Sequence, residues 1–302
     1  MKYNLLVILG PTASGKTRLG VGAAQALGGE ILSADSRQVY KGMDLGTGKD
    51  LTEYGDIPYH LIDLVNPGYE FNVFEFQRRF FEAFAEIGER NRLPILVGGT
   101  GLYLEAVLKG YRLVEVPENP ELRQELTALG SEQLFAKLTA LRPTLHNTTD
   151  TLDRERLIRA IEIAAGERAA SLHLPPFPEL RPMVFGVQWE RAELRRRIFA
   201  RLKERLGQGM IEEVERLHRQ GVAYETLEFY GLEYRFIARF LKGELNRNDM
   251  VQKLASAIHQ FAKRQETWFR RMERQGTQIH WLNGAGNALE ELLHFWRSPT
   301  TA

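Results

Sequence analysis

The residues best placed to do chemistry form one short run near the N-terminus, Gly10-Pro11-Thr12-Ala13-Ser14-Gly15-Lys16-Thr17. It matches the pattern G-x-x-x-x-G-K-[ST] at every fixed position and follows the apolar residues 4–9. In such a loop the glycines let backbone N–H groups curl around a phosphate, and the positive end of the next helix faces it. Lys16 adds a point charge, and the Thr17 hydroxyl can hold Mg²⁺. We therefore predict a site for a di- or triphosphate.

Asp35 is the second candidate, because it closes the next predicted strand. Strand ends in an open α/β sheet face the ligand crevice, so Asp35 should point toward the bound phosphate. One interpretation makes it a general base beside the group that receives transfer. The other makes it a helix N-cap, since Asp-Ser suits capping. The residues alone leave both interpretations open.

A conventional nucleotide hydrolase is disfavoured, because it also needs an acid at the end of an apolar strand to hold Mg²⁺. The best later strand, residues 95–97, runs into Gly98-Gly99-Thr100-Gly101, which has no carboxylate. Leu61-Ile62-Asp63 has too few apolar residues to replace it. Other phosphate chemistry stays open, including that of small-molecule kinases.

Alternating strands and helices must hold these residues in place. Apolar runs predict strands at residues 4–9, 30–33, 59–63, 94–97, 183–187 and 278–282. Helices are predicted at residues 16–27 and 74–90, the second with an apolar stripe that includes Phe74, Phe80 and Phe84. This alternation predicts an α/β fold, a P-loop NTPase-like core whose mostly parallel sheet is flanked by helices.

A helical pattern interrupts that alternation after a proline-containing break at residues 116–120 and ends in a proline-rich stretch at residues 174–178. We therefore expect an inserted all-helical domain at residues 118–183. The P-loop core would consist of residues 1–117 and 184–302, and long amphipathic helices would dominate its second part.

Composition narrows the functional classes. The absence of cysteine among the 302 residues excludes disulfides, thiolate zinc sites and a cysteine nucleophile. No apolar run reaches membrane-spanning length, and Met1-Lys2 leaves no room for a signal peptide, so we expect a cytoplasmic protein. The net charge of +1 conceals a basic region, residues 190–274, with 19 Lys and Arg against 13 Asp and Glu. That excess is compatible with a polyanionic partner.

Several blocks together resemble the tRNA dimethylallyltransferases, and they span nearly the whole chain. The matching blocks are Gly10–Thr17, Asp35-Ser36-Arg37-Gln38-Val39-Tyr40, Gly98-Gly99-Thr100-Gly101-Leu102-Tyr103, residues 153–162, residues 194–214 and Ala262-Lys263-Arg264-Gln265-Glu266-Thr267-Trp268-Phe269-Arg270. A P-loop alone is common, but this set in this order is highly specific. The resemblance is to the bacterial type, because the zinc-binding tail of eukaryotic relatives is missing.

The resemblance implies transfer of a dimethylallyl group from dimethylallyl diphosphate to the exocyclic amine of the adenosine 3′-adjacent to the anticodon in tRNA. The P-loop would hold the donor's diphosphate, with Mg²⁺ on Thr17. Lys16 and Arg201 would stabilise the departing diphosphate. Asp35 would accept the proton of the attacking amine, and Thr100 would sit beside the adenosine.

The resemblance also implies a set of tRNA contacts around the anticodon stem-loop. They are Asp35, Ser36, Arg37, Gln38, Thr100, Arg123, Glu155, Arg156, Arg159, Tyr234, Arg235, Lys263, Arg264 and Arg270. On a helix, Lys263, Thr267 and Arg270 share one face. Phe269 and Trp268 suit packing better than RNA contact.

One departure from the family pattern concerns Glu233-Tyr234-Arg235, where a glycine usually precedes the tyrosine. We expect the extra charge of Glu233 to alter the RNA-facing patch and to leave the donor site untouched.

Three other functions compete with this interpretation, under which we expect a monomer. A small-molecule P-loop kinase would use Asp35 as base and bind ATP, but it leaves GGTGLY and KRQ-x-TWFR unexplained. An isopentenyltransferase acting on free adenine nucleotides would need neither the insertion nor the basic region. An RNA-binding protein with an inactive P-loop would not need Lys16, Thr17 and Asp35.

Overall fold

The computed structural model describes residues 2–111, 113, 116, 118–141, 153–170 and 177–298. The chain divides into two compact units, one made of Met1–Gly110 with Pro178–Ala302 and the other of Tyr111–Phe177. The expected insertion, residues 118–183, begins and ends a few residues later than the second unit. Pro182 and Met183 pair with the first strand of the sheet, which places them in the first unit.

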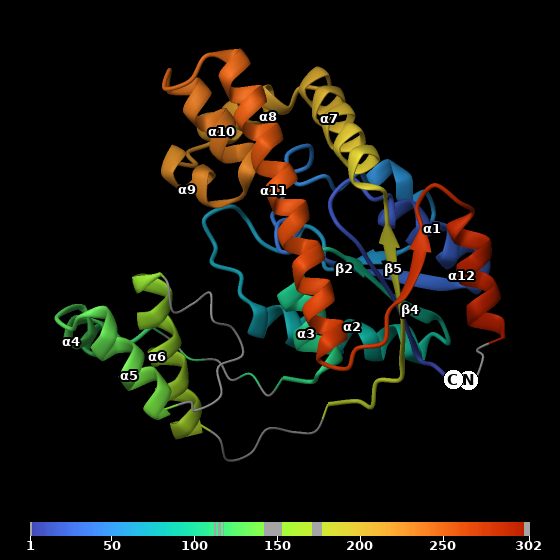
Figure 1. Ribbon diagram of the computed structural model, residues 1–302, viewed down its shortest axis with the longest axis horizontal. Coiled ribbons are helices and arrows are strands. Elements are labelled where there is room, and N and C mark those ends of the chain that lie inside the picture. The colour runs from blue at the N-terminus through green and yellow to red at the C-terminus, as the bar shows by residue number, and fades with distance from the viewer. Residues whose placement is uncertain are drawn as a thin grey trace. The chain divides into compact units, whose positions relative to one another are not determined.

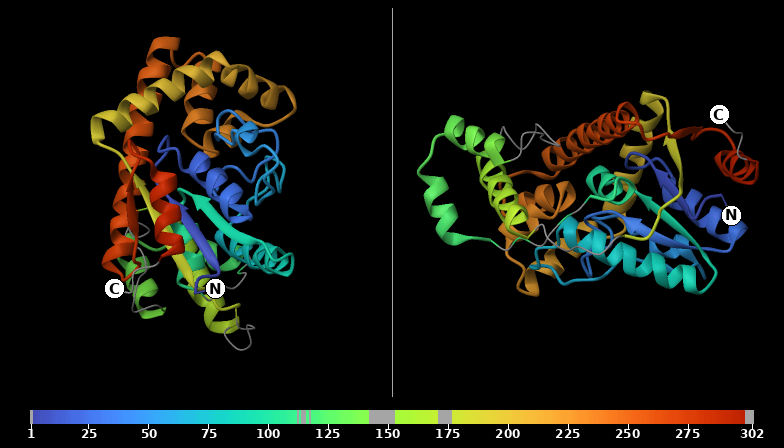
Figure 2. Two further views of the ribbon diagram at one scale, coloured as in Figure 1. Left: turned by 90° about the vertical axis from the view of Figure 1, so that its right-hand side faces the viewer. Right: turned by 90° about the horizontal axis from the view of Figure 1, so that it is seen from below.

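The first unit is built on a parallel six-stranded sheet in the order β3-β2-β4-β1-β5-β6 (Figure 1). The strands are β1 Leu5–Leu9, β2 Gly29–Ala34, β3 Tyr59–His60, β4 Leu93–Gly98, β5 Pro182–Gln188 and β6 His280–Asn283. In both views of Figure 2 the red C-terminal segment with β6 lies beside the yellow β5. The predicted α/β fold with a P-loop-like core is confirmed.

Helices cover both faces of this sheet. α1 (Lys16–Leu27) and α12 (Ala288–Arg297) share an apolar cluster with Leu6 and Ile8 of β1. α2 (Val73–Glu89) packs on β2 and β4 and contacts α3 (Gly101–Leu108). Right-handed crossovers that run in opposite directions along a sheet place their helices on opposite faces, which separates α1 from α2.

Two predicted details of these elements are wrong. In α2 the apolar stripe begins at Phe76, which is 0% exposed, and not at the half-buried Phe74; its predicted members Phe80 and Phe84 are buried. The strand predicted at residues 59–63 holds only Tyr59–His60. Leu61 and Asp63 have φ of 66° and 55°, a left-handed conformation that takes the chain out of the sheet.

The second part of the first unit is helical and has its own apolar cluster, which includes Leu202, Met210, Tyr234 and Ile258. Its helices are α7 Arg191–Gly207, α8 Met210–Arg219, α9 Tyr224–Phe229, α10 Leu232–Leu241 and α11 Arg247–Arg274. The Asn246 side chain starts α11 by accepting a hydrogen bond from the N–H of Asp249. A 3-10 helix, η1 Leu51–Tyr54, precedes β3.

The second unit, taken by itself, consists of α4 Pro120–Thr127, α5 Ser131–Leu141 and α6 Arg154–Ala170 (green in Figure 1). Leu126, Leu134, Leu138, Leu157 and Ile161 form its core. Across the residues that the structure describes, no helix is long and apolar enough to cross a membrane.

Candidate active site

The P-loop joins β1 to α1, and side chains from the C-terminal half of the chain hold its carbonyl groups. Arg197 Nε donates to the Ala13 carbonyl at 3.0 Å, and Trp189 Nε1 donates to the Ser14 carbonyl at 2.9 Å. The Arg197 guanidinium also lies over the Trp189 ring, 4.1 Å from its centroid. The Thr12 and Ser14 N–H groups donate to Gln265 Oε1 and to the Pro11 carbonyl, so the N–H groups at the start of α1 are the ones left for a ligand.

Nothing in the P-loop caps the start of α1. Gly15 is the N-cap, with φ of 86° and no side-chain hydrogen bond to the first turn. The Ser14 hydroxyl is buried and has no hydrogen-bond partner, and a Cβ on Gly10 would lie 2.7 Å from it. Uncapped N–H groups at the positive end of a helix and an unsatisfied hydroxyl suit an anion with several oxygen atoms.

Lys16 is placed to complete this anion site. Its Nζ donates to the Pro11 carbonyl at 3.3 Å. Burial lowers the Lys16 pKa to about 8, against the opposing effect of the nearby Asp35 carboxylate. Lys16 therefore keeps its proton at neutral pH. Because Asp35 lies close enough to affect the pKa of Lys16, the P-loop and the predicted base belong to one site.

Arg201 from α7 points to the same region. It shares an acid, Asp50, with Arg205, and the sequence patterns indicated neither of these two residues. Arg201 Nη2 donates to Asp50 Oδ2, and Arg205 Nη2 lies 3.0 Å from both Asp50 oxygens. Burial raises the pKa of Asp50, but the charges of Arg201 and Arg205 outweigh it and hold the pKa below its ordinary value. Asp50 has φ of 47°, and Gly48 leaves room for the Arg205 guanidinium. No local sequence pattern signals such a pair across 150 residues.

Glu233 lies beside the P-loop. It lines a pocket of about 20 Å³, room for one water molecule, together with Thr12, Ala13, Arg201 and Arg205. Burial raises the pKa of Glu233, against the opposing effect of the two arginines. The expectation that Glu233 leaves the donor site untouched is therefore wrong: α10 begins at Leu232 and carries this side chain toward the P-loop.

Asp35 and Thr100 meet at the carboxyl edge of the sheet, because β2 and β4 are neighbours with Ala34 opposite Gly98. Thr100 Oγ1 accepts the Ser36 N–H at 3.0 Å, and Asp35 Oδ1 accepts the Arg37 N–H at 2.9 Å. Residues 36–39 form a turn, so Asp35 is no helix cap. Its other oxygen has no hydrogen-bond partner in the described parts of the chain, which leaves it available to an incoming donor.

Gln265 connects the two halves of the site. Its side chain is 8% exposed; Oε1 accepts the Thr12 N–H at 2.9 Å, and Nε2 donates to the Gly99 carbonyl at 2.9 Å. A Cβ on Gly99 would lie 2.4 Å from that nitrogen. One amide thus fixes the P-loop relative to the loop that carries Thr100. The sequence gives little sign of this role: Gln265 differs from the basic and aromatic residues around it in the run 262–270 only by its uncharged amide.

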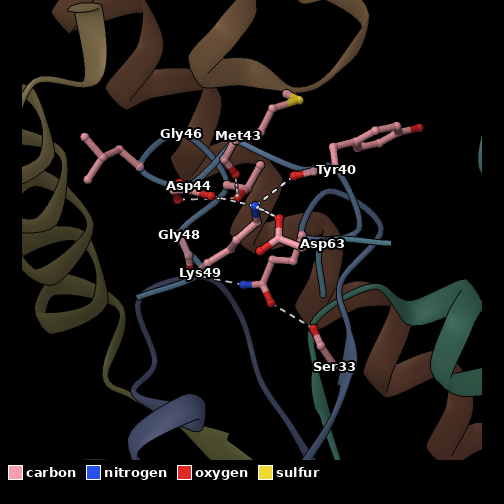
Figure 3. Close-up of polar contacts among 12 residues, drawn as sticks. Ser33, Tyr40, Met43, Asp44, Gly46, Gly48, Lys49 and Asp63 are labelled. Carbon is pink, nitrogen blue, oxygen red and sulfur yellow. Dashed lines mark hydrogen bonds and ion pairs between the residues drawn. The ribbon is translucent and has the colours of Figure 1, made fainter. Parts of the chain in front are cut away.

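A buried lysine pins the loop that follows Asp35 (Figure 3). Lys49 is 0% exposed and donates to the Tyr40 carbonyl at 2.7 Å, Asp44 Oδ1 at 2.6 Å and Asp63 Oδ1 at 2.5 Å. Gln38, expected to contact RNA, is buried beneath this loop. It accepts from the Ser33 hydroxyl at 2.8 Å and donates to the Gly48 carbonyl at 3.0 Å.

Tyr234, also expected to contact RNA, is 1% exposed. Its hydroxyl donates to Glu213 Oε1 at 2.6 Å, and the Glu213 carboxylate accepts the N–H groups of residues 44–46. Its neighbour Arg235 is exposed and donates to the Glu228 carbonyl at 3.1 Å. Arg37 lies over the ring of exposed Phe229.

The basic face predicted on α11 is exposed. Lys263, Arg264 and Arg270 all face solvent, whereas Phe269 is 0% exposed. Trp268 is half-buried against Gly101, where a Cβ would lie 2.3 Å from its ring. These two aromatic side chains pack as predicted.

In the second unit the expected RNA cations share one buried acid. Arg123 Nε donates to Glu162 Oε1 at 3.0 Å and Arg159 Nη1 donates to Glu162 Oε2 at 3.3 Å. Burial raises the pKa of Glu162, but the hydrogen bonds from Arg123, the Asn119 N–H and Arg159 together outweigh it, so the net shift of the pKa is downward. Glu155 and Arg156 are exposed.

Among the described residues, no three His, Asp or Glu side chains gather to hold a metal ion. Thr17 lies in the first turn of α1, and its hydroxyl has no hydrogen-bond partner among the residues that the structure describes. A hydroxyl together with diphosphate and water oxygens is a donor set that Mg²⁺ accepts, so the residues fit the predicted ion.

The chain is similar to known proteins over nearly its whole length. A sequence model described as IPP transferase matches residues 38–272. A "tRNA dimethylallyltransferase 2" of Syntrophotalea carbinolica is 68% identical over 298 residues, 99% of this chain and 100% of the relative. A "tRNA dimethylallyltransferase 1" of Geotalea uraniireducens is 68% identical over 96% of each chain.

Solved structures are similar as well. The tRNA isopentenylpyrophosphate transferase of Bacillus halodurans is 32% identical, with a TM-score of 0.72 over 98% of this chain and 96% of that one. A eukaryotic dimethylallyltransferase described as acting on tRNA has a TM-score of 0.78 over 98% of this chain and 80% of that one. At 21% identity the second likeness shows the fold alone.

Proposed function

We propose a detailed reaction on the premise that this chain belongs to the IPP transferase family. The chain is a tRNA dimethylallyltransferase that prenylates adenosine in tRNA. In our proposal the donor is dimethylallyl diphosphate, and the acceptor is the exocyclic amine of the adenosine 3′-adjacent to the anticodon. One observation carries the proposal: an acid and a hydroxyl stand at the sheet edge beside an uncapped P-loop, and Gln265 joins the two loops.

On the donor side, the bond from the allylic carbon to the diphosphate oxygen breaks as the new carbon–nitrogen bond forms. Negative charge then grows on the leaving diphosphate. The P-loop N–H groups, Lys16 and Arg201 are fixed before that charge develops, and such preorganised donors are often the largest contribution to catalysis. Asp50 holds Arg201 in position and is itself held by Arg205.

On the acceptor side, an adenine amine is a weak nucleophile, and its proton must leave as the bond forms. The uncommitted oxygen of Asp35 accepts that proton, while its other oxygen stays on the Arg37 N–H. Thr100, whose hydroxyl accepts the Ser36 N–H, would sit next to the reacting adenosine. The base must leave the stack of the anticodon loop to reach Asp35, which costs a few kcal/mol.

Thr17 would hold Mg²⁺ through its free hydroxyl, and the ion would add positive charge to the donor's diphosphate. Ser36, Arg37, Arg235, Lys263, Arg264 and Arg270 would contact the RNA from the first unit. Arg123, Glu155, Arg156 and Arg159 would contact it from the inserted domain. Gln38 and Tyr234 would act indirectly, by holding the loop after Asp35. The enzyme would work as a monomer in the cytoplasm, with its tRNA substrate.

The test is an incubation of purified protein with Mg²⁺, labelled dimethylallyl diphosphate and unmodified tRNA, with AMP as acceptor and ATP as donor in parallel reactions. We expect label in tRNA and none in AMP. Mapping the label to the adenosine beside the anticodon would support the stated position. Label in AMP alone would favour an enzyme of free nucleotides, and phosphate transfer from ATP would favour a kinase.

A further inference from the structure

Phe229 is an exposed aromatic residue that the reaction does not yet use. It ends α9 and is 64% exposed, more than any other large apolar side chain of the described residues. A single exposed apolar residue is ordinary on a protein surface, so exposure alone implies nothing. The surroundings of this ring carry the argument.

Arg37 covers one side of this ring, with its guanidinium carbon 5.5 Å from the ring centroid. Within the described part of the chain, no side chain or carbonyl accepts a hydrogen bond from that guanidinium. Arg37 therefore keeps a planar cation with all its N–H donors free, beside an open aromatic face. Arginine and aromatic rings in that arrangement are what unstacked nucleobases bind.

The ring is tied to the catalytic edge of the sheet. Phe229 packs edge-on against Tyr230, whose ring lies 4.4 Å from that of Tyr40 at the end of the turn that follows Asp35. Arg37 is anchored in this turn through its N–H bond to Asp35. The exposed ring is thus held at a set position relative to the proposed base.

We propose that Phe229 and Arg37 form a stacking platform for the nucleotide base adjoining the target adenosine, an inference that rests on the proposed function. When the adenosine leaves the anticodon loop, its neighbour loses a stacking surface. The Phe229 ring replaces that surface, and the free N–H groups of Arg37 bind the adjoining base edge or phosphate. The platform lowers the cost of extruding the adenosine.

The test compares Phe229→Leu, which keeps an apolar side chain but removes the ring, with Phe229→Trp, which keeps an aromatic face. Stacking on one base is worth about a tenfold change in affinity, so F229L should raise the Kd and KM for tRNA about tenfold. F229W should stay near wild type, and donor affinity should not change in either variant. Phe199→Leu, which alters another exposed phenylalanine (45% exposed), is the matched control and should change nothing.

A second readout reports stacking directly. With 2-aminopurine in place of the base next to the target, wild-type protein should quench its fluorescence on binding and F229L should not. Equal quenching and equal tRNA affinity in F229L would overturn the platform, as would a defect in Arg37→Ala with none in F229L. If wild-type protein transfers no prenyl group to tRNA, the proposed function fails instead.

Discussion

The proposed donor site around the P-loop and the proposed RNA surface of α11 treat their charges in opposite ways. At the donor side, Arg201 and Arg205 share Asp50, and Arg197 is stacked on Trp189 while it holds a P-loop carbonyl. On the proposed RNA surface of α11, Lys263 and Arg270 face solvent with no ion pair among the residues that the structure describes, whereas Arg123 and Arg159 of the second unit share the buried acid Glu162.

This difference fits the two ligands that we propose. A small diphosphate offers few contacts, so its site gains most from groups that are fixed in advance and lose little freedom on binding. A tRNA offers a long line of phosphates, and unpaired surface cations gain affinity by releasing the ions condensed on it. The donor site should therefore be sensitive to geometry, and the RNA surface to salt.

The largest expected effect comes from Asp35, which is one of many expected RNA contacts but the one proposed general base. We expect Asp35→Ala to lower the rate of single-turnover transfer by about 10²–10⁴-fold, because it removes the general base. Donor and RNA affinities should stay close to wild type. Rapid-quench measurement of labelled tRNA checks this, with Asp35→Asn as the variant that keeps the hydrogen bond to Arg37. A wild-type rate in both variants would remove Asp35 from the mechanism.

The next effect should appear in the pH dependence of donor binding. The pKa of Lys16 is lowered to about 8, so its positive charge is complete at lower pH and is lost as the pH rises through 8. We expect affinity for dimethylallyl diphosphate to be about tenfold weaker at pH 9 than at pH 7. Calorimetric titrations across that range test this, and Lys16→Arg should remove the dependence because arginine keeps its charge. A flat profile in wild-type protein would contradict it.

The smallest effects should come from single RNA-side cations. We expect Lys263→Ala or Arg270→Ala to weaken tRNA binding a few-fold and to reduce the slope of log K against log salt by about 0.7–0.9. Lys253→Ala, at an exposed position near the start of the same helix, is the control. The measurement is tRNA affinity from low to moderate salt. An unaltered slope would mean that these cations are only solvated and do not contact RNA phosphates.

Sequence patterns predicted the part of the molecule that depends on short stretches of chain. The helix at residues 16–27 has the predicted limits, because a glycine loop starts it and Gly28 ends it in a left-handed conformation. The position of Asp35 at the carboxyl edge of the sheet followed from the rule that strand ends face the ligand crevice, whereas Thr100 was placed by the family resemblance alone.

What the sequence did not predict depends on residues that are distant in the chain. Asp50 pairs with Arg205, and Gln265 binds both Thr12 and Gly99, through contacts that no local periodicity encodes. Glu233 was expected on the RNA side, since the residues around it suggested only a turn; the packing of α10 places it by the P-loop. Local patterns give elements and motifs, whereas the supports of a site emerge only when the elements pack.

The central claim is that the fold alone assembles the donor site, before RNA arrives. Equilibrium dialysis of labelled dimethylallyl diphosphate against the protein with Mg²⁺, in the absence of RNA, tests it most directly. The account predicts saturable binding of one donor per chain, weakened by Lys16→Ala. Binding that appears only after tRNA is added would contradict the claim, because RNA would then have to complete the site.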